Sequence, residues 1–159
     1  MNEYPVIKVR GGKIKVGDEV YRGKKVIEKM EEMIADHELV YVIDLDGCKK
    51  NSPNLELYKK VDGGIWLDAC PRGVEDVMDL IVAGAEKITI WGMKEEYFKE
   101  ISEAVERDIF IGGKDVRWAT EMVRKYNFRG IVIEEKQESI SKIETWKIFE
   151  SQGFIRRVK

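Results

Sequence analysis

Short apolar runs rich in β-branched residues alternate along the chain with longer stretches of helical periodicity. The runs Leu39–Asp44, Ile65–Leu67 and Lys87–Trp91 each end at, or just before, an acidic residue or a glycine. Such runs are typical of parallel strands that are buried on both faces and end at the rim of a sheet. The stretch from Val40 to Met93 therefore predicts strand, short helix, strand, helix and strand, and it organises the rest of the chain.

The same pattern predicts further elements on both sides of this central stretch. Strands show alternation or short apolar runs, whereas helices show apolar positions three and four residues apart. Glycines and an Asn-Ser-Pro-Asn break mark the turns. The predicted strands are Tyr4–Val9, Lys13–Val16 in a small hairpin, Asp108–Ile111, Gly130–Ile133 and Phe154–Val158, and the predicted helices are Lys24–Asp36, Leu55–Val61, Val74–Ala83, Lys94–Glu106, Asp115–Tyr126 and Ser139–Ser151.

Alternation of strand and helix favours a parallel sheet with right-handed crossovers. No linker or change of composition divides the chain, so residues 1–159 are expected to form one domain. A faint repeat, in which Asn54–Lys59 is similar to Lys142–Lys147, indicates two related halves. An eight-unit (βα) barrel usually takes ~200 residues or more. The sequence therefore predicts an α/β, TIM-barrel-like fold with an incomplete barrel of about six to seven parallel strands.

The composition indicates a globular protein: 43% of residues are hydrophobic, 36% are charged, and the net charge is −2. Lysine and glutamate are balanced, so no basic surface for nucleic acid is expected. Their abundance also suits a heat-adapted source. No apolar run approaches the ~20 residues that span a bilayer, and the N-terminus lacks the apolar stretch of a signal peptide. We expect a cytoplasmic protein without a nucleic-acid or membrane partner.

The two cysteines, Cys48 and Cys70, form no Cys-x-x-Cys pair, and with His37 as the one histidine the chain has no familiar zinc arrangement. Cytosolic thiols normally stay reduced, so free thiols are expected rather than a structural disulfide. Asp68 lies two residues before Cys70 and disfavours its thiolate, which predicts an inert thiol. No cofactor is predicted.

Four stretches of the chain carry a family resemblance: PVIKVRGGKIKV, VYVIDLDG, NLELYKKV and WLDACPRGVEDVMDLIVAGAEKITIWG. Their order and spacing resemble the histidine-biosynthesis barrels, namely the aminoaldose-phosphate isomerase and the cyclase of imidazole-glycerol-phosphate synthase. The chain is most similar to uncharacterised archaeal relatives of the isomerase. The resemblance covers the part of the chain before Asp108, and it implies a (βα)8 barrel of two similar halves that binds phosphate at the C-terminal rim of its strands.

The chain departs from this family where the family's chemistry takes place. The resemblance places proton-transferring carboxylates at the ends of strands one and five, where this chain has Lys8 and Gly112-Gly113. An ammonium cannot accept a proton, so the acid–base pair of the isomerase is missing. The phosphate-binding turns match Asp68–Arg72 and Gly92-Met93, which leaves Arg72 and Gly92 to bind an anion. The resemblance thus implies a relative that is not the histidine-pathway isomerase itself.

Polar residues still follow several predicted strands and are expected to gather at the rim. Lys8, Asp44 and Asp68 are the candidate catalytic residues. Asp46, with Asp44 and Asp68, offers oxygen ligands for a divalent cation, but ion pairs closing the rim are the favoured interpretation and no metal site is predicted. The candidate phosphate-binding residues are Arg72, Gly92, Gly112 and Gly113, the last two as an anion-binding turn before a helix.

Two functions remain open. The first is a site for a small, phosphosugar-like anion at the rim, with isomerase- or lyase-type chemistry on a phosphorylated metabolite if the protein is an enzyme. The second is a catalytically silent barrel that serves as a binding or assembly module, its mouth partly filled by Trp91 and Met93. An incomplete barrel would expose two strand edges, so a two-fold homodimer is expected to cover the open seam.

Overall fold

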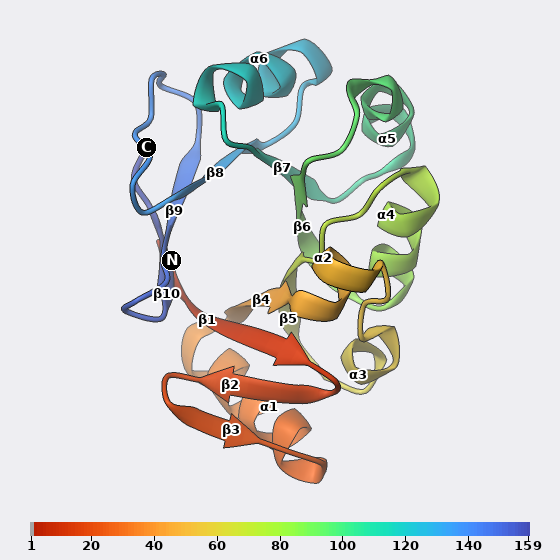
Figure 1. Ribbon diagram of the computed structural model, residues 1–159, viewed down its shortest axis with the longest axis vertical. Helices are drawn as coiled ribbons and strands as arrows, with labels where there is room; N and C mark the ends of the chain where they lie inside the picture. Colours follow the sequence, from red (N-terminus) through yellow and green to blue (C-terminus); the bar gives the residue numbers. More distant parts are fainter. Residues whose placement is uncertain (1) are drawn as a thin grey trace.

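The computed structural model describes residues 2–159, which form a closed barrel with an added hairpin (Figure 1). Strand β10 pairs with β1 and completes the ring. Strands β2 (Lys13–Val16) and β3 (Glu19–Tyr21) extend the sheet outside the barrel from β1. The eight barrel strands, in order, are β1 (Glu3–Arg10), β4 (Leu39–Asp44), β5 (Gly64–Asp68), β6 (Ala85–Trp91), β7 (Asp108–Gly112), β8 (Gly130–Glu134), β9 (Thr145–Phe149) and β10 (Phe154–Arg157).

The barrel is mixed in strand direction. Strands β1 and β4 to β9 run parallel to one another, whereas β10 is antiparallel to both of its neighbours, β9 and β1. No helix separates β8 from β9, and β9 turns directly back into β10. The prediction of an incomplete, all-parallel, TIM-barrel-like fold is therefore wrong, because the ring is closed and its last strand runs the other way.

The predicted helix Ser139–Ser151 is the source of this error. The structure has strand β9 (Thr145–Phe149) there, with Trp146 and Ile148 in the cluster of side chains inside the barrel. Alternation and aromatic or β-branched side chains suit a strand. An antiparallel return needs only a short turn, whereas a parallel strand needs a crossover of a dozen or more residues. Because the last strand returns through a short turn and needs no crossover helix, 159 residues suffice to close the barrel.

Within the described residues six helices lie along one side of the ring, and Figure 1 shows them next to β1 and β4 to β8. A 3-10 turn, Glu95–Tyr97, leads into the fifth. Within the described residues no helix is both long enough and apolar enough to cross a lipid bilayer. The helices are α1 (Lys24–His37), α2 (Leu45–Lys50), α3 (Leu55–Lys59), α4 (Val74–Val82), α5 (Phe98–Ala104) and α6 (Val116–Tyr126).

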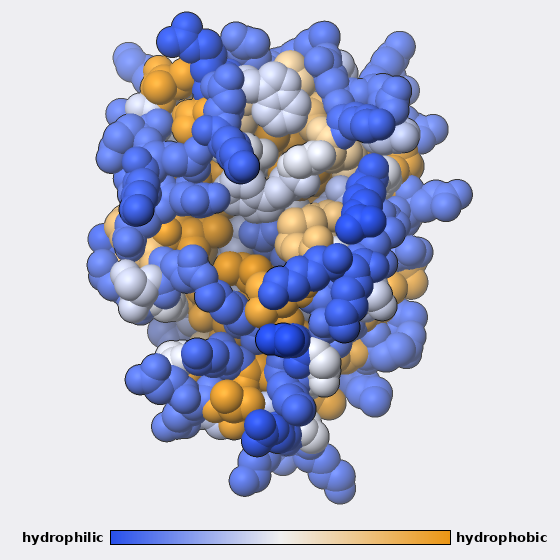
Figure 2. All heavy atoms as spheres, in the orientation of Figure 1, coloured by the Kyte–Doolittle hydropathy of each residue, from blue (hydrophilic) through white to orange (hydrophobic). Residues whose placement is uncertain are grey.

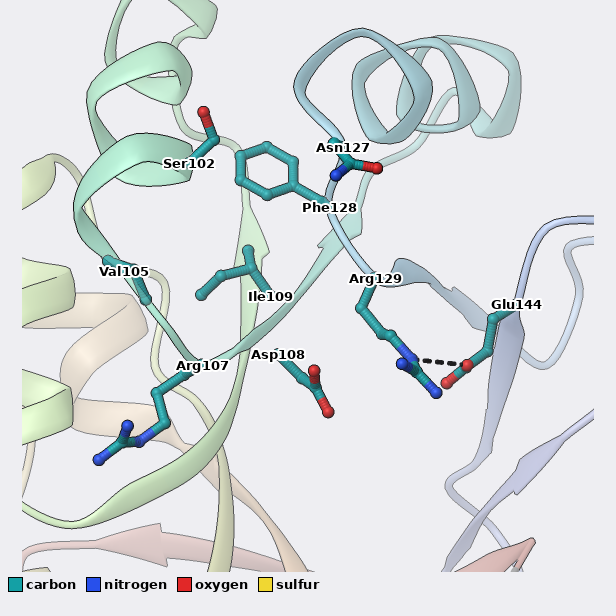
Figure 3. A pocket seen from close by; sticks show the side chains of 9 residues that line it. All are labelled: Ser102, Val105, Arg107, Asp108, Ile109, Asn127, Phe128, Arg129 and Glu144. Carbon is teal, nitrogen blue, oxygen red and sulfur yellow. Dashed lines mark hydrogen bonds and ion pairs between the residues drawn. The ribbon is translucent and has the colours of Figure 1, made fainter.

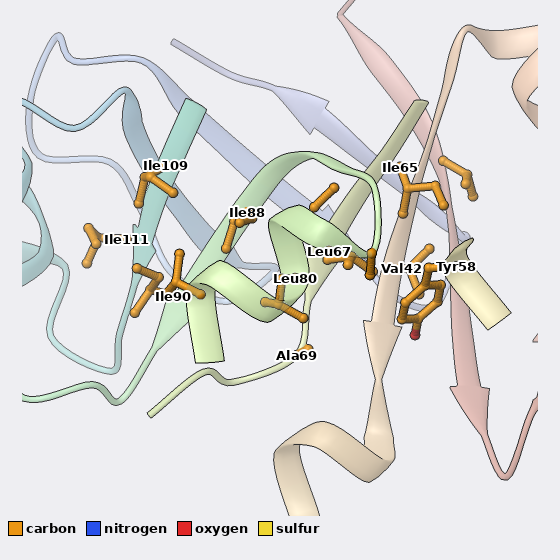
Figure 4. Close-up of a cluster of buried hydrophobic side chains, with 14 of the residues drawn as sticks. Val42, Tyr58, Ile65, Leu67, Ala69, Leu80, Ile88, Ile90, Ile109 and Ile111 are labelled. Atoms are coloured by element: carbon orange, nitrogen blue, oxygen red, sulfur yellow. The ribbon is translucent and has the colours of Figure 1, made fainter. Parts of the chain in front are cut away.

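Two apolar cores follow from the alternation of side chains along the strands. The outer core lies between the strands and the helices; Figure 4 shows Leu67, Ile88 and Ile109 in it, together with Leu80 of α4. The inner core fills the barrel with aromatic rings and is centred on Trp66, which is completely buried. The barrel is thus a packed core rather than a pore, and open space remains only at its ends.

The closed ring bears on the expected dimer. Pairing of Glu3–Pro5 with Phe154–Arg156 covers the seam that the dimer was predicted to cover. The physical reason for that prediction is therefore gone, and the homodimer stays a prediction. Hydrophilic side chains cover most of the face in Figure 2, with apolar ones scattered among them. Isolated apolar side chains such as Val82 and Ile140 are ordinary surface features and do not indicate a partner.

Candidate functional site at the mouth of the barrel

A cavity of about 480 Å³ opens where the parallel strands end. Its lining includes Ile43 of β4, Asp68 of β5, Trp91 of β6 and Glu134 of β8. The carboxyl ends of parallel barrel strands are the usual place for a binding or catalytic site. We call this cavity the mouth pocket.

Asp68 is the central polar group of the mouth pocket. It ends β5 two residues after Trp66, so both side chains point into the barrel. Its Oδ2 accepts hydrogen bonds from the Tyr41 hydroxyl at 2.7 Å and from Trp91 Nε1 at 2.9 Å. Asp68 is only 4% exposed. Its other oxygen, Oδ1, has no hydrogen-bond partner among the described residues, so it is left for a ligand in the pocket.

The environment of Asp68 shifts its titration toward neutral pH. Burial raises the pKa of Asp68 from 3.8 to about 6; the hydrogen bonds from Tyr41 and Trp91 oppose this rise, and the charge of Glu134 adds to it. Burial, with the charge of Asp68, also raises the pKa of Tyr41 well above 10.0, so the phenol stays protonated and donates. A carboxyl that titrates near neutral pH can act as an acid or a base in catalysis.

We expect Asp68 to titrate near pH 6, which carbon-13 NMR of its carboxyl can measure. Because the pKa is raised in the folded state, its contribution to stability is fully present below pH 3.8 and is lost as the pH rises through about 6. Asp68→Asn should therefore raise the melting temperature relative to the wild type above pH 6, with little difference at pH 4.

Glu134→Gln provides a second test, since loss of the Glu134 charge should lower the pKa of Asp68. Glu121→Gln, a change at an exposed position on α6, is the matched control and should leave that pKa unchanged. A wild-type Asp68 that titrates near pH 4 would contradict both expectations.

The structure does not bring Asp44 to this pocket. Ile43 is in register with Asp68, so Asp44, one residue further along β4, points to the outside of the barrel. There it is fully buried and caps α2 by accepting a hydrogen bond from the Gly47 amide at 2.8 Å. It also accepts from the Asn54 amide at 2.8 Å and from the Tyr58 hydroxyl. Asp44 therefore organises the loop beside the barrel and lies apart from Asp68.

Asp46 also forms hydrogen bonds within this loop. Its Oδ2 accepts from the Gly11 amide at 2.7 Å and from Asn54 Nδ2 at 2.9 Å, which ties the turn after β1 to α2. The hydrogen bond from Asn54, followed by that from Gly11, lowers the pKa of Asp46. The three aspartates that could have shared a divalent cation are thus divided between two sides of the sheet.

Lys8 lies next to the mouth pocket. Its ammonium pairs with Glu150, a pocket residue, while Lys8 itself lines a neighbouring depression. Within the described residues it makes no ion pair with Asp68. The structure therefore does not bring Lys8, Asp44 and Asp68 together as the predicted catalytic group. Of these three residues, only Asp68 lines the mouth pocket.

The residues predicted to bind phosphate have other roles in the structure. Arg72 is exposed, and its backbone amide donates to Asp76 at 2.9 Å. Gly92 has φ +69° and forms the turn after β6. A side chain at Gly112 would lie 2.6 Å from the Trp91 ring, so this glycine makes room for the indole that contacts Asp68. Met93, which was expected to help fill the mouth, is buried in the outer core instead.

The turn at Gly113 has its own hydrogen-bond partners. The Gly113 carbonyl accepts from Gln137 Nε2 at 2.9 Å. At the start of α6, the carboxylate of Asp115 accepts from the amides of Arg117 at 2.9 Å and Trp118 at 3.2 Å. Two of the N–H groups at the start of α6 that could bind an anion are therefore already bonded to a carboxylate.

Cys48 and Cys70 form a disulfide with a Cα–Cα distance of 4.8 Å, so the prediction of free thiols is wrong. They come close because Gly47 packs against Ala69; a side chain at Gly47 would lie 2.6 Å from the Ala69 carbonyl oxygen. The sequence does contain a signal for this pair. Leu45–Cys48 and Leu67–Cys70 both read Leu-Asp-small-Cys, at the ends of two neighbouring parallel strands.

The disulfide also determines whether the two cysteines could bind a metal in the pocket. The sulfurs of Cys48 and Cys70 and a carboxylate oxygen of Asp68 lie within 4.8 Å of one another. Thiolates would bind a soft metal such as zinc, but sulfurs joined in a disulfide cannot serve as such ligands. In the oxidised state Asp68 is the one remaining ligand of this group.

A second cavity, of about 440 Å³, lies at the opposite end of the barrel (Figure 3). Three of its charged side chains are paired: Arg129 Nε contacts Glu144 at 2.9 Å, and Asp108 lies 3.9 Å from Lys87. The N-terminal end of barrel strands usually serves stability. The mouth pocket is the better candidate because it contains a buried carboxyl with a raised pKa.

Comparison with known proteins adds no family to this description. A scan against models of known protein families finds no match, and a search of curated proteins finds no relative. The resemblance to the histidine-biosynthesis barrels therefore rests on the four sequence stretches alone and stays a prediction.

Proposed function

We propose that the mouth pocket binds a small polar molecule and that Asp68 transfers a proton to or from it. One observation carries this proposal: Asp68 is buried and oriented by Tyr41 and Trp91, and it has an oxygen left for a ligand. A volume of about 480 Å³ suits a metabolite. Proton transfer is the step that isomerases and lyases share, so the proposal keeps the type of reaction expected from the sequence.

The charge of the pocket favours a neutral or cationic ligand. Glu134, Glu135 and Glu150 line it with Asp68, and Lys136 is the one basic residue among the lining residues. The nearby ammonium of Lys8 is already paired with Glu150. Carboxylates repel a phosphate. We therefore infer an amine or an uncharged polar ligand and treat a phosphorylated metabolite as the competing candidate.

The catalytically silent module remains the second candidate. It is favoured by the aromatic filling of the barrel, which confines any ligand to a shallow mouth, and by the Lys8–Glu150 ion pair at the rim. A cytoplasmic location belongs to both candidates. The Cys48–Cys70 bond is compatible with it, because intracellular proteins of hyperthermophiles are rich in disulfides.

A thermal-shift screen at pH 5 to 8 tests the proposal. The panel should contain amines and amino sugars, neutral sugars and phosphosugars. A ligand at ten times its Kd should raise the melting temperature by about 3 °C or more. The shift should disappear in Asp68→Asn and persist in Asp108→Asn, which changes the cavity at the opposite end of the barrel.

Each outcome separates the candidates. Stabilisation by neutral or cationic compounds that depends on Asp68 supports the proposal. Stabilisation by phosphosugars that survives Asp68→Asn and is lost in Arg72→Ala would place an anion site on the rim instead. No stabilisation by any compound would favour the silent module.

A further inference from the structure

We propose that Cys48–Cys70 is a reversible dithiol–disulfide couple that exchanges with uncharged or cationic thiols entering the mouth pocket, and that Asp68 handles the proton of the exchange. This activity uses the same pocket as the proposed function but needs no metabolite, so it can be measured alone.

The first observation is access. Both cysteines are only half-buried, and both line the mouth pocket. A thiol in the pocket can therefore reach the disulfide without unfolding of the barrel. Accessible disulfides are the ones that exchange, whereas purely structural disulfides resist reduction.

The second observation is the position of Asp68. An oxygen of its carboxyl lies within 4.8 Å of both sulfurs, at the end of the strand that leads to Cys70. Tyr41 and Trp91 hold the carboxyl through Oδ2 and leave Oδ1 without a partner among the described residues. A proton can pass between the Asp68 carboxyl and a sulfur after a small movement, or through one water molecule.

The third observation is that both cysteines are held by other contacts. Asp44 and Asp46 fix α2, which carries Cys48, through hydrogen bonds with Gly47, Asn54 and Gly11. The residue Asp68, which precedes Cys70 by two positions, belongs to β5 and pairs with β4 and β6. Reduction would break one bond but leave these anchors, so the two thiols stay within reach of one another and can reoxidise.

Exchange with an external dithiol takes two steps. A thiolate of an external dithiol attacks one sulfur; the Cys48–Cys70 bond breaks, and the departing cysteine sulfur takes a proton from Asp68. The second thiol of the reagent gives its proton to Asp68 and attacks the mixed disulfide, which releases the oxidised cyclic reagent and the second cysteine as a thiolate. That thiolate takes up the proton that the first thiol of the reagent had given to solvent. The protein disulfide gains two electrons, and the dithiol loses them.

The rim also selects among thiols. Glu134, Glu135 and Glu150 surround the approach to the sulfurs, so an anionic thiol is repelled. We expect cysteamine, which is cationic, to react fastest per thiolate, 2-mercaptoethanol to be intermediate and glutathione to be slowest. The difference between the extremes should be about fivefold and should shrink in 1 M salt, which screens charges.

The decisive measurement is reduction of the folded protein by dithiothreitol, followed by alkylation and mass spectrometry. The rate should rise in proportion to dithiothreitol, circular dichroism should show that the fold is retained, and cystamine, the disulfide of cysteamine, should restore the protein disulfide once dithiothreitol is removed. A rate that does not depend on dithiothreitol, or loss of the fold upon reduction, would overturn the proposal, because reduction would then require unfolding.

Asp68→Asn tests the proton step, and Glu135→Gln is the matched control on the same pocket. At pH 8 the Asp68 carboxylate disfavours a nearby thiolate, so Asp68→Asn should react about fivefold faster than the wild type. At pH 5 the protonated Asp68 can donate, so the variant should be slower. The ratio should cross unity near pH 6. A ratio that is constant with pH, as expected for Glu135→Gln, would remove Asp68 from the exchange.

The two proposals can fail separately. If the disulfide is reduced reversibly but no compound stabilises the protein in the thermal-shift screen, the redox proposal stands and the metabolite site is refuted. If a ligand binds but the disulfide is reduced only when the protein unfolds, the metabolite site stands and the redox proposal is refuted.

Discussion

Replacing Trp66 by alanine is expected to lower the free energy of unfolding by about 4 kcal/mol, the largest loss foreseen for a single side chain here. Trp66 is fully buried, and its ring lies 4.5 Å from Phe110 and 5.2 Å from Trp146 between ring centroids. Its Nε1 donates to the Thr89 hydroxyl at 2.8 Å. Alanine would leave a cavity at the centre of the closed ring, where the strands cannot collapse inward. Denaturant titration followed by circular dichroism measures the change.

Trp118→Ala is the control for this prediction. Trp118 lies on α6 and is only half-buried, against the outer core. Its loss should cost about 1–2 kcal/mol, because less apolar surface is withdrawn from water. Equal losses for the two variants would show that the inner core does not hold the barrel together.

Asp44→Ala is expected to lower the free energy of unfolding by about 3–4 kcal/mol. The variant would leave the buried Gly47 amide, the Asn54 amide and the Tyr58 hydroxyl without their shared acceptor. Burial is the largest cause of the raised pKa of Tyr58 and remains in the variant, so the phenol cannot escape the loss by ionising. Chemical denaturation at pH 7 is the measurement.

Two further variants test whether this loss of stability comes from the acceptor oxygens of Asp44. Asp44→Asn keeps one acceptor oxygen and should cost about half as much. Asp79→Ala removes an exposed carboxylate on α4 and should change stability by less than about 0.5 kcal/mol. If Asp44→Ala were as mild as Asp79→Ala, the network around α2 would not be a stabilising element.

The central strands could be read from the sequence because they are continuous apolar runs that end at a polar residue or a glycine. The predicted ranges Leu39–Asp44 and Asp108–Ile111 agree with β4 and β7 to within a residue. The closing strand could not be read in this way. The run Thr145–Phe149 suits a strand, but the pattern of residues 139–151 as a whole predicts a helix, and pairing with β8 and β10 is what selects the strand that forms there.

The candidate site was partly predictable. Asp68 follows a strand core, and its place at the mouth agrees with that pattern. Asp44 follows a strand core too, but whether it points inward or outward depends on the register between β4 and β5, which one sequence does not reveal. The Cys48–Cys70 bond depends on the same register, together with the close approach that Gly47 allows.

The pairing of the first strand with the last has a consequence for synthesis of the chain. Strand β1 leaves the ribosome long before its partner β10, which includes residues Phe154–Arg157. Until then the nascent chain carries an unpaired strand edge that can join another chain. Truncated products that stop before β10 should therefore be prone to self-association, a hazard that disappears only when the final hairpin docks.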